Sequence, residues 1–217
     1  MSFFEKKDKK LLIFDLDGTL IDSSEGLYKA FKHASTITNL TPPSKKIFSS
    51  NIGPKIKDLF KFFYGDNLAE ERFIKNFRHL YDEIYVYDFK KKYLINSMIR
   101  LLKDFESIIL TNKPCKASSK ILKFLKLDSK IRKIIGIDFY DTNGGSKEKN
   151  ILQFLKRNKY DKIIYIGDTL EDLIISEKIK ANFIGIKSHF IWEKIFLNKI
   201  NIFQKIDKNL VKQIEKI

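Results

Sequence analysis

The stretch LLIFDLDGTL, residues 11–20, places a short apolar run directly before two aspartates, Asp15 and Asp17. The run predicts a buried strand that ends at Asp15, and Gly18 permits a sharp turn in which backbone N–H groups face an anion. Two like charges about 4 Å apart repel by ~4 kcal/mol at an effective dielectric constant of about 20. The pair therefore indicates one carboxylate acting as nucleophile and one as acid/base, with a structural Asp- and Gly-rich turn as the alternative for this motif alone.

Beyond this stretch, the sequence alternates between helix and strand. Short apolar runs predict strands at residues 107–110, 133–137, 162–166 and 182–186. Amphipathic segments between them predict helices at residues 93–103, 117–127, 147–158 and 170–179. Strands separated by helices predict an α/β fold with a Rossmann-like parallel sheet covered by helices on both faces.

Residues 22–89 interrupt this alternation with a different pattern. Large apolar residues recur at helical spacing within residues 27–37, 55–64 and 68–87, and Pro-containing loops separate these segments. We expect a small helical domain inserted into the α/β domain. The predicted domains are residues 1–21 with 90–217 for the α/β core, and residues 22–89 for the insertion.

Polar residues stand directly after the predicted strands, although they are far apart in the sequence. They are Asp15, Asp17, Thr111, Asn112 and Asp168. In open α/β sheets, ligands bind outside the carboxyl ends of the strands, where such residues converge. The sequence therefore predicts a site at this edge of the sheet.

A second acidic group, in the stretch GDTLED of residues 167–172, points to a metal ion. Asp168 and Asp172 are four residues apart, so both can lie on one face of a first helical turn. The alternative is an acidic helix N-terminus that serves the helix dipole, which contributes only about 0.3–1 kcal/mol. That contribution is too small to gather these carboxylates beside Asp15 and Asp17. A hard dication such as Mg²⁺ prefers carboxylate oxygens, and we predict one here.

Three further residues are candidate phosphate ligands. Thr111 offers a hydroxyl group and Asn112 an amide at a strand end, although both groups could instead satisfy their own loop. Lys147 opens a predicted helix and could neutralise both the nucleophile and a phosphate, with Lys149 as a close competitor.

The composition narrows the choice of partners and of compartment. The net charge is +15, but only five of the 42 basic residues are Arg, so we expect a solvated basic surface rather than a nucleic-acid-binding patch. The single cysteine, Cys115, excludes an intrachain disulfide and fits a cytoplasmic location. No run approaches the roughly 20 apolar residues of a membrane span. The mixed segment of residues 188–217 is expected to form a helix with an apolar stripe, including residues 190–192, 195–196 and 202–203, that packs on the core, with binding to a membrane surface as the alternative.

Read in order, four motifs resemble the haloacid dehalogenase superfamily and its phosphoglycolate phosphatase-like branch. They are DLDGTLIDS at residues 15–23, ILTNKP at residues 109–114, SKEKNI at residues 146–151 and IGDTLED at residues 166–172. The resemblance implies a magnesium-dependent phosphatase that hydrolyses a small phosphate monoester, such as a phosphoglycolate-like compound or a sugar phosphate, through an aspartyl-phosphate.

The resemblance also implies a role for each matching position. Asp15 is similar to the nucleophile and Asp17 to the acid/base. Thr111 and Lys147 are similar to the phosphate-binding residues, and Asn112 lies beside them. The implied magnesium ligands are the carboxylates of Asp15, Asp168 and Asp172 and the carbonyl group of Asp17.

The insertion resembles the helical cap of that branch. The stretch NIGPK, residues 51–55, is similar to a cap loop that faces the substrate, which makes Gly53 and Lys55 candidate substrate contacts. The family often has a second Pro where this chain has Lys55. A cation at that position would suit a substrate with a second negative group.

Two other functions remain open at this point. A phosphosugar mutase would use the same aspartyl-phosphate, and the motifs do not separate it from a phosphatase. A basic nucleic-acid-binding protein that has kept a phosphatase fold is the other alternative, although the intact acidic residues argue against it. We expect a small phosphorylated metabolite as partner, no membrane contact, and a monomer or a homodimer.

Overall fold

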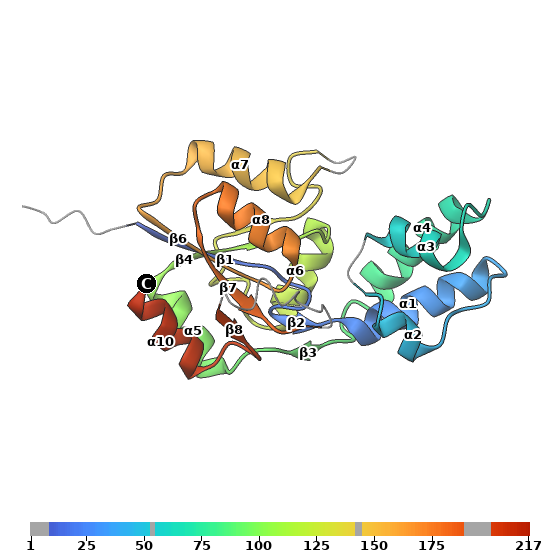
Figure 1. Ribbon diagram of the computed structural model, residues 1–217, viewed down its shortest axis with the longest axis horizontal. Coiled ribbons are helices and arrows are strands. Elements are labelled where there is room, and N and C mark those ends of the chain that lie inside the picture. The colour runs from blue at the N-terminus through green and yellow to red at the C-terminus, as the bar shows by residue number, and fades with distance from the viewer. Residues whose placement is uncertain (1–8, 53–54, 142–144, 189–200) are drawn as a thin grey trace, which may run out of the picture.

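The computed structural model describes residues 9–52, 55–141, 145–188 and 201–217. Its centre is a six-stranded sheet with the order β5-β4-β1-β6-β7-β8, in which every pair of neighbours is parallel (Figure 1). The strands are β1 (Lys10–Phe14), β4 (Glu106–Leu110), β5 (Lys133–Ile135), β6 (Lys162–Gly167), β7 (Asn182–Ile186) and β8 (Asn201–Phe203). The strand that precedes the two aspartates, β1, lies between β4 and β6, in the middle of the sheet.

Helices cover both faces of this sheet, as the sequence pattern predicts. Alternate residues of β1 point to opposite faces: Leu12 and Phe14 belong to one buried cluster, and Leu11 and Ile13 to another. The first face is covered by α5 (Ile95–Asp104), α6 (Cys115–Phe124) and α10 (Lys208–Lys216). The second is covered by α7 (Lys147–Arg157) and α8 (Leu170–Lys178), on the side of the sheet opposite α5 and α10 in Figure 1.

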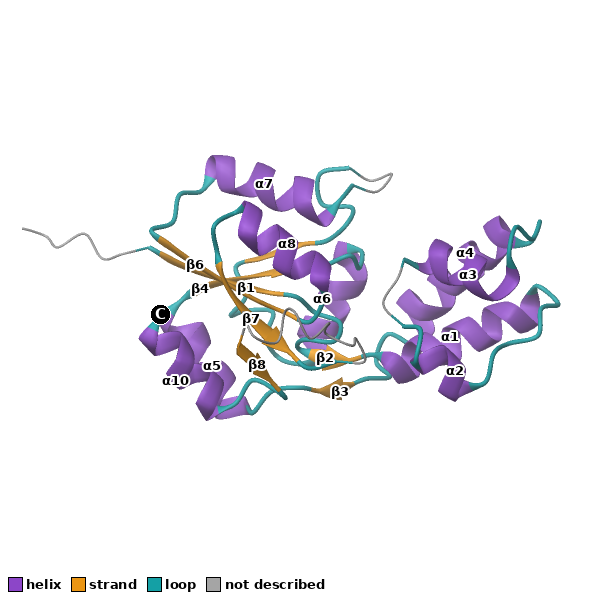
Figure 2. Cartoon of the chain, in the orientation of Figure 1, coloured by secondary structure: helices purple, strands orange, loops and turns teal. Residues whose placement is uncertain are grey.

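The insertion is helical and has a hydrophobic core of its own (Figure 2). It contains α1 (Ser24–Ile37), α2 (Lys45–Ser49), α3 (Ile56–Tyr64), α4 (Glu70–His79) and a π-helix, η1 (Leu80–Ile84). The ring of Phe31 lies at its centre and is fully buried. It packs against five other aromatic rings, with centroid distances of 4.9 to 6.4 Å, from Phe48, Phe63, Tyr64, Phe73 and Phe77. We call this insertion the cap.

Two very short strands join the cap to the α/β core. Strand β2 (Ile21–Asp22) pairs antiparallel with β3 (Lys90–Lys91), with Ile21 opposite Lys91 and Asp22 opposite Lys90. The chain therefore leaves the core and returns to it at neighbouring residues. These bounds support the division into residues 1–21 with 90–217 and residues 22–89, which we keep as a proposal.

The structure corrects four details of the predicted elements. The sheet does not end with β7, because β8 pairs parallel with it. Residues 202–203 therefore belong to a strand; the helix that packs on the core is α10, through Leu210, Val211 and Ile214. The helix expected at residues 68–87 divides into α4 and η1, and the strand expected at residues 133–137 ends at Ile135. Residues 190–192 and 195–196 of the expected stripe lie outside the described residues. None of the described helices is long and apolar enough to cross a membrane.

Candidate active site

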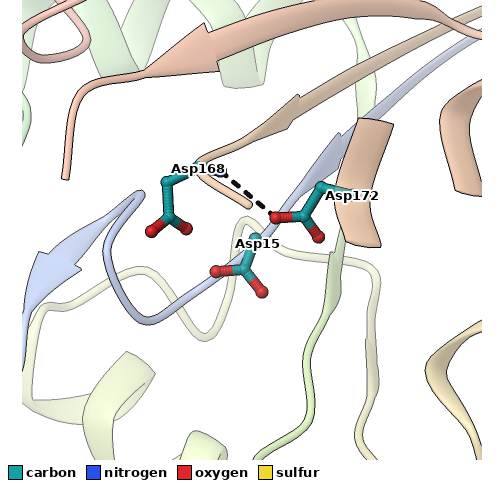
Figure 3. Close-up of side chains that lie close together, drawn as sticks. All are labelled: Asp15, Asp168 and Asp172. Atoms are coloured by element: carbon teal, nitrogen blue, oxygen red, sulfur yellow. Dashed lines mark hydrogen bonds between the residues drawn. The ribbon is translucent and has the colours of Figure 1, made fainter. Parts of the chain in front are cut away.

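Three buried carboxylates meet at the carboxyl end of the sheet. Asp15 follows β1, Asp168 follows the neighbouring strand β6, and Asp172 lies in the first turn of α8 (Figure 3). One oxygen from each lies within 4.8 Å of the others. The parallel pairing of Phe14 with Ile166 aligns the ends of β1 and β6, and this alignment brings the two distant motifs together.

The turn after β1 is folded closely against Asp168. Gly18 has a φ of +88°, and a Cβ atom at this position would lie 2.0 Å from Oδ2 of Asp168. Position 18 therefore requires glycine both for its backbone conformation and for the space that the Asp168 carboxylate fills. The Thr19 hydroxyl donates a hydrogen bond of 3.0 Å to Oδ1 of Asp168 and fixes the orientation of the carboxylate.

Lys147 joins two of the carboxylates. Its Nζ donates to Oδ1 of Asp15 at 2.6 Å and to Oδ1 of Asp172 at 2.5 Å, and its side chain is only 2% exposed. It is the first residue of α7, whose N-terminus is capped by the side chain of Ser146. Lys149, the competing candidate, is exposed, so the structure favours Lys147.

The pKa values of these groups are set by burial and by the charges that surround them. Burial raises the pKa of Asp15 well above its usual range, and the charges of Asp172 and Asp168 raise it further, against the opposing effect of Lys147. Burial and the charge of Asp172 likewise raise the pKa of Asp168 to about 7. Burial alone would raise the pKa of Asp172, but Lys147, Tyr165 and Thr169 hold it below its ordinary value.

Both oxygens of Asp172 already accept hydrogen bonds from the protein. Oδ1 accepts from Lys147 and from the Tyr165 hydroxyl at 2.6 Å. Oδ2 accepts from the Thr169 hydroxyl at 2.7 Å and from the backbone N–H groups of Thr169 and Asp168 at 3.0 and 3.2 Å. Asp172 therefore fixes both Lys147 and the turn that carries Asp168.

The donor set fits a divalent cation. Asp15 and Asp168 supply hard oxygen atoms, both face a cavity, and both have pKa values raised by burial and by the negative charge of neighbouring carboxylates. A bound dication would offset this negative charge directly. Asp15 and Asp168 are better placed as carboxylate ligands than Asp172, whose oxygens are both engaged by protein donors.

The other predicted polar residues differ in whether they line the cavity and in whether their polar groups already have partners in the protein. Thr111 is buried at the end of β4 and lines the cavity, where its oxygen accepts from the backbone N–H of Lys113 at 3.1 Å. One N–H of the Asn112 amide donates to Glu171 at 2.6 Å. Lys55 lines the cap side of the cavity, and Gly53 lies outside the described residues.

The cavity has a volume of about 670 Å³ and lies between the core and the cap. Polar groups of the core form one wall, and mostly apolar side chains of the cap form the other. The cap wall includes Leu27, Phe48, Ile52, Ile56, Leu59 and Phe77. A cavity of this size holds a small organic molecule together with its phosphate group.

Two residues of the cavity wall were not found by the sequence analysis. The Tyr81 hydroxyl, on η1 of the cap, donates to Oδ1 of Asp17 at 3.1 Å. Nζ of Lys113 lies 3.4 Å from Oδ2 of Asp17 and 3.7 Å from the centre of the Tyr81 ring. The position of Lys113 next to Asn112, within the motif ILTNKP, is a sequence signal that could have identified it. Tyr81 is 64 residues away from Asp17 in a helical segment rich in aromatic residues, so no local signal marked it.

Comparison with known proteins identifies the family. The model of the family described as "Haloacid dehalogenase-like hydrolase" matches residues 12–186, which include both acidic motifs and the cap. The chain belongs to this family of hydrolases. The resemblance given by the four motifs is thereby confirmed, as is the α/β fold with an inserted helical cap.

Individual relatives are similar over different shares of their length. A phosphoglycolate phosphatase from Aquifex aeolicus is 28% identical over 76% of this chain and 78% of that protein. A putative pyrophosphatase, PpaX from Clostridium perfringens, is 34% identical over 43% of each chain, so that match spans less than half of the relative. The crystal structure of a predicted phosphatase from Clostridium acetobutylicum is 25% identical, covers 96% of this chain and 99% of that one, and has a TM-score of 0.79.

Proposed function

We propose that this protein is a magnesium-dependent phosphatase that hydrolyses a small phosphate monoester through an aspartyl-phosphate on Asp15. The observation that carries the proposal is the arrangement around Asp15: a buried carboxylate at a strand end, facing a cavity, with the Lys147 ammonium at 2.6 Å and Asp168 beside it. The phosphatases among its relatives support the reaction class.

The proposed reaction has two steps. In the first, an oxygen of Asp15 attacks phosphorus, the bond from phosphorus to the ester oxygen breaks, and the departing oxygen takes a proton from Asp17. In the second, Asp17 accepts a proton from water as that water attacks the aspartyl-phosphate, and the bond between phosphorus and Asp15 breaks to release phosphate. Lys147 lies where it can pair with the phosphate as well as with Asp15, and Thr111 can donate its hydroxyl proton to a phosphate oxygen.

Mg²⁺ fits this site, held by Asp15, Asp168 and, as the family resemblance implies, the carbonyl group of Asp17. When bound, it neutralises the carboxylates and stabilises the charge that develops on the phosphoryl oxygens. Asp172 contributes by fixing Lys147 and the Asp168 turn. The cap covers the cavity and limits the access of bulk water.

The cap wall and the relatives support a substrate class. Lys55 and Arg78 line the cavity, and neither has an ion-pair partner within 4.0 Å among the described residues. Two such cations favour a phosphate monoester with a second negative or strongly polar group, such as a phosphoglycolate-like compound or a sugar phosphate. The Aquifex relative supports the first of these. A cytoplasmic location and a monomeric or homodimeric state remain predictions.

The test is a screen of phosphorylated metabolites with the purified protein. Phosphate release should require Mg²⁺, stop with EDTA and return when Mg²⁺ is restored. Full turnover in metal-free buffer would contradict the proposal. Isomerisation of a phosphosugar without net phosphate release would favour the mutase instead.

Two substitutions separate the proposed roles of the aspartates. Asp15→Asn removes the attacking carboxylate, so turnover should fall to background and no phosphoenzyme burst should form. Asp17→Asn removes a proton donor whose contribution is about 10²–10⁴-fold in rate, and this help matters most for a poor leaving group. It should therefore slow sugar phosphate hydrolysis far more than the first step with p-nitrophenyl phosphate, measured in single-turnover experiments. A burst from Asp15→Asn, or equal slowing of both substrates by Asp17→Asn, would mean that the roles are wrong.

A further inference from the structure

The carboxylate of Asp17 is held by one group from the cap and one from the core. The Tyr81 hydroxyl of the cap donates to Oδ1 at 3.1 Å, and the Lys113 ammonium of the core lies 3.4 Å from Oδ2. Asp17 itself follows β1, on the loop that also carries Gly18. The side chain proposed to transfer protons therefore lies at a direct contact between cap and core.

The cap sets the position of the Tyr81 hydroxyl. Tyr81 is 4% exposed, and its ring stacks on Phe77 of the cap core with centroids 5.7 Å apart. It lies in η1, where the backbone N–H of Tyr85 bonds to the carbonyl of Leu80 at 2.9 Å, five residues earlier. A π-helical turn changes which side chains of a helix face a given direction, and such turns occur frequently at functional sites.

Lys113 connects the same two groups from the other side. Its side chain is 3% exposed, and Nζ lies 3.7 Å from the centre of the Tyr81 ring, within the range of a cation–π contact. It lies in the loop after β4, which ends at Leu110, and its backbone N–H donates to the Thr111 side chain, which anchors the loop at the end of the strand. Lys113 therefore contacts Asp17 and Tyr81 together.

We propose that Tyr81 and Lys113 are positioning residues for Asp17, so that its carboxyl group has its working orientation only when the cap lies against the core. The Tyr81 hydroxyl donates to Oδ1 and the Lys113 ammonium pairs with Oδ2, so the two contacts together fix the orientation from which the carboxyl group exchanges a proton with the leaving group and with water. Lys113 contacts both the Tyr81 ring and Oδ2 of Asp17, and so fixes the two side chains relative to each other. The inference rests on the proposed phosphatase function and adds that proton transfer depends on a cap residue.

The decisive variant is Tyr81→Phe, which removes the hydroxyl but keeps the ring that stacks on Phe77 and contacts Lys113. Turnover of an alkyl phosphate should fall about 10- to 100-fold, because one hydrogen bond to a charged group is lost. The burst rate with p-nitrophenyl phosphate, whose leaving group needs little proton assistance, should stay close to that of the unaltered protein. Tyr85→Phe is the matched control, because its hydroxyl pairs with His33 outside the cavity, and it should change neither rate.

Lys113→Met tests the second positioning residue. It should produce the same selective loss with alkyl phosphates, whereas Lys116→Met, which removes an exposed lysine paired with Glu83, should not. Because both residues act on one carboxylate, the double variant Tyr81→Phe/Lys113→Met should lose less activity than the product of the two single effects.

Several results would overturn the inference. Equal slowing of both substrates by Tyr81→Phe would indicate a structural role or a role in substrate binding, and unchanged alkyl phosphate turnover would exclude a role in proton transfer. Fully additive effects in the double variant would mean that the residues do not share Asp17. Failure of the proposed function itself is distinguishable, because the unaltered protein would then release no phosphate with Mg²⁺ from any substrate.

Discussion

Lys147 is the shared counter-ion of two buried carboxylates, and this makes it important for stability as well as for chemistry. The charges of Asp15 and Asp172 raise its pKa well above the usual range against the opposing effect of burial, so it stays charged. Removing one partner from a buried ion cluster typically costs about 3–5 kcal/mol. We therefore expect Lys147→Met to be inactive and to lower the free energy of unfolding in EDTA by about that amount.

Urea denaturation followed by circular dichroism measures this change in stability. The control is Lys149→Met on the same helix, an exposed position where substitutions usually change stability by less than about 0.5 kcal/mol. Equal free energies of unfolding for the two variants would contradict the role of Lys147 as a shared counter-ion of the two carboxylates.

The raised pKa of Asp168 predicts how the stabilisation of the protein by Mg²⁺ depends on pH. Its pKa in the folded protein is about 7, above the ordinary value of 3.8, so between these pH values the folded state binds more protons than the unfolded state. The metal-free protein should therefore lose stability from this group as the pH rises through that range. Mg²⁺ binds the ionised carboxylate, so it should raise the melting temperature more at pH 8 than at pH 5.5.

Differential scanning fluorimetry with and without Mg²⁺ at the two pH values tests this expectation. Asp168→Asn removes the titrating group, and in this variant the difference between the two pH values should largely disappear. If Mg²⁺ raised the melting temperature of the unaltered protein more at pH 5.5 than at pH 8, the predicted direction of the pH dependence would be wrong.

At the residue level, the sequence revealed the groups that lie in local motifs and not those that meet through the tertiary fold. Asp15, Asp17 and Asp168 stand directly after apolar runs, so the pattern alone predicts their convergence. Tyr81 contacts Asp17 only because the cap folds back onto the core. Such a contact depends on the packing of whole elements, which no spacing of residues along the chain encodes.

Among the elements, α1 carries the residue on which the cap core depends. Phe31 contacts rings from the rest of the cap, and the cap cluster is separate from the two clusters on the faces of the sheet. Phe→Ala substitutions in a packed core cost about 3–5 kcal/mol. We expect Phe31→Ala to unfold the cap or greatly increase its opening while the sheet stays folded.

Hydrogen exchange measured by mass spectrometry should show this difference. Peptides from α1, α3 and α4 should lose protection, and peptides from β1, β4 and β6 should keep it. Phe62→Ala, an exposed position on α3, is the control. Simultaneous loss of protection in the sheet would mean that cap and core unfold as one unit.

The element boundaries show where sequence patterns are insufficient. Long amphipathic segments predicted the helices around the sheet well, because burial of one face dominates their sequence. Strand β8 has only three residues, half-buried or exposed, and becomes a strand by pairing with β7. The change from α4 to η1 keeps the same apolar periodicity, so the pattern at residues 68–87 indicated one continuous helix.

For the whole molecule, the net charge of +15 should affect the encounter with an anionic substrate. A strongly positive electrostatic field raises the association rate of anions. Salt screens this field: at 0.1 M the Debye length is about 10 Å, so charges farther away than this contribute little. The ratio kcat/KM for a phosphate monoester should therefore fall severalfold between low and high ionic strength, while kcat changes little. Steady-state kinetics in NaCl and in KCl separate this screening from binding of a particular ion. A ratio independent of salt would indicate that the surface charge does not steer the substrate.

The pairing of β2 with β3 also has a consequence for the evolution of the protein. Because Asp22 and Lys90 lie opposite each other, everything between them begins and ends at one point on the surface of the core. Insertions between adjacent chain positions at such a surface site disturb the host fold little. A gene can therefore lengthen, shorten or exchange this segment while the nucleophile strand and the order of the sheet stay unchanged. The stretch that carries Lys55 and the stretch that carries Asp15 can thus change separately, and the contact of Tyr81 with Asp17 is the point at which the proposed chemistry constrains the inserted segment.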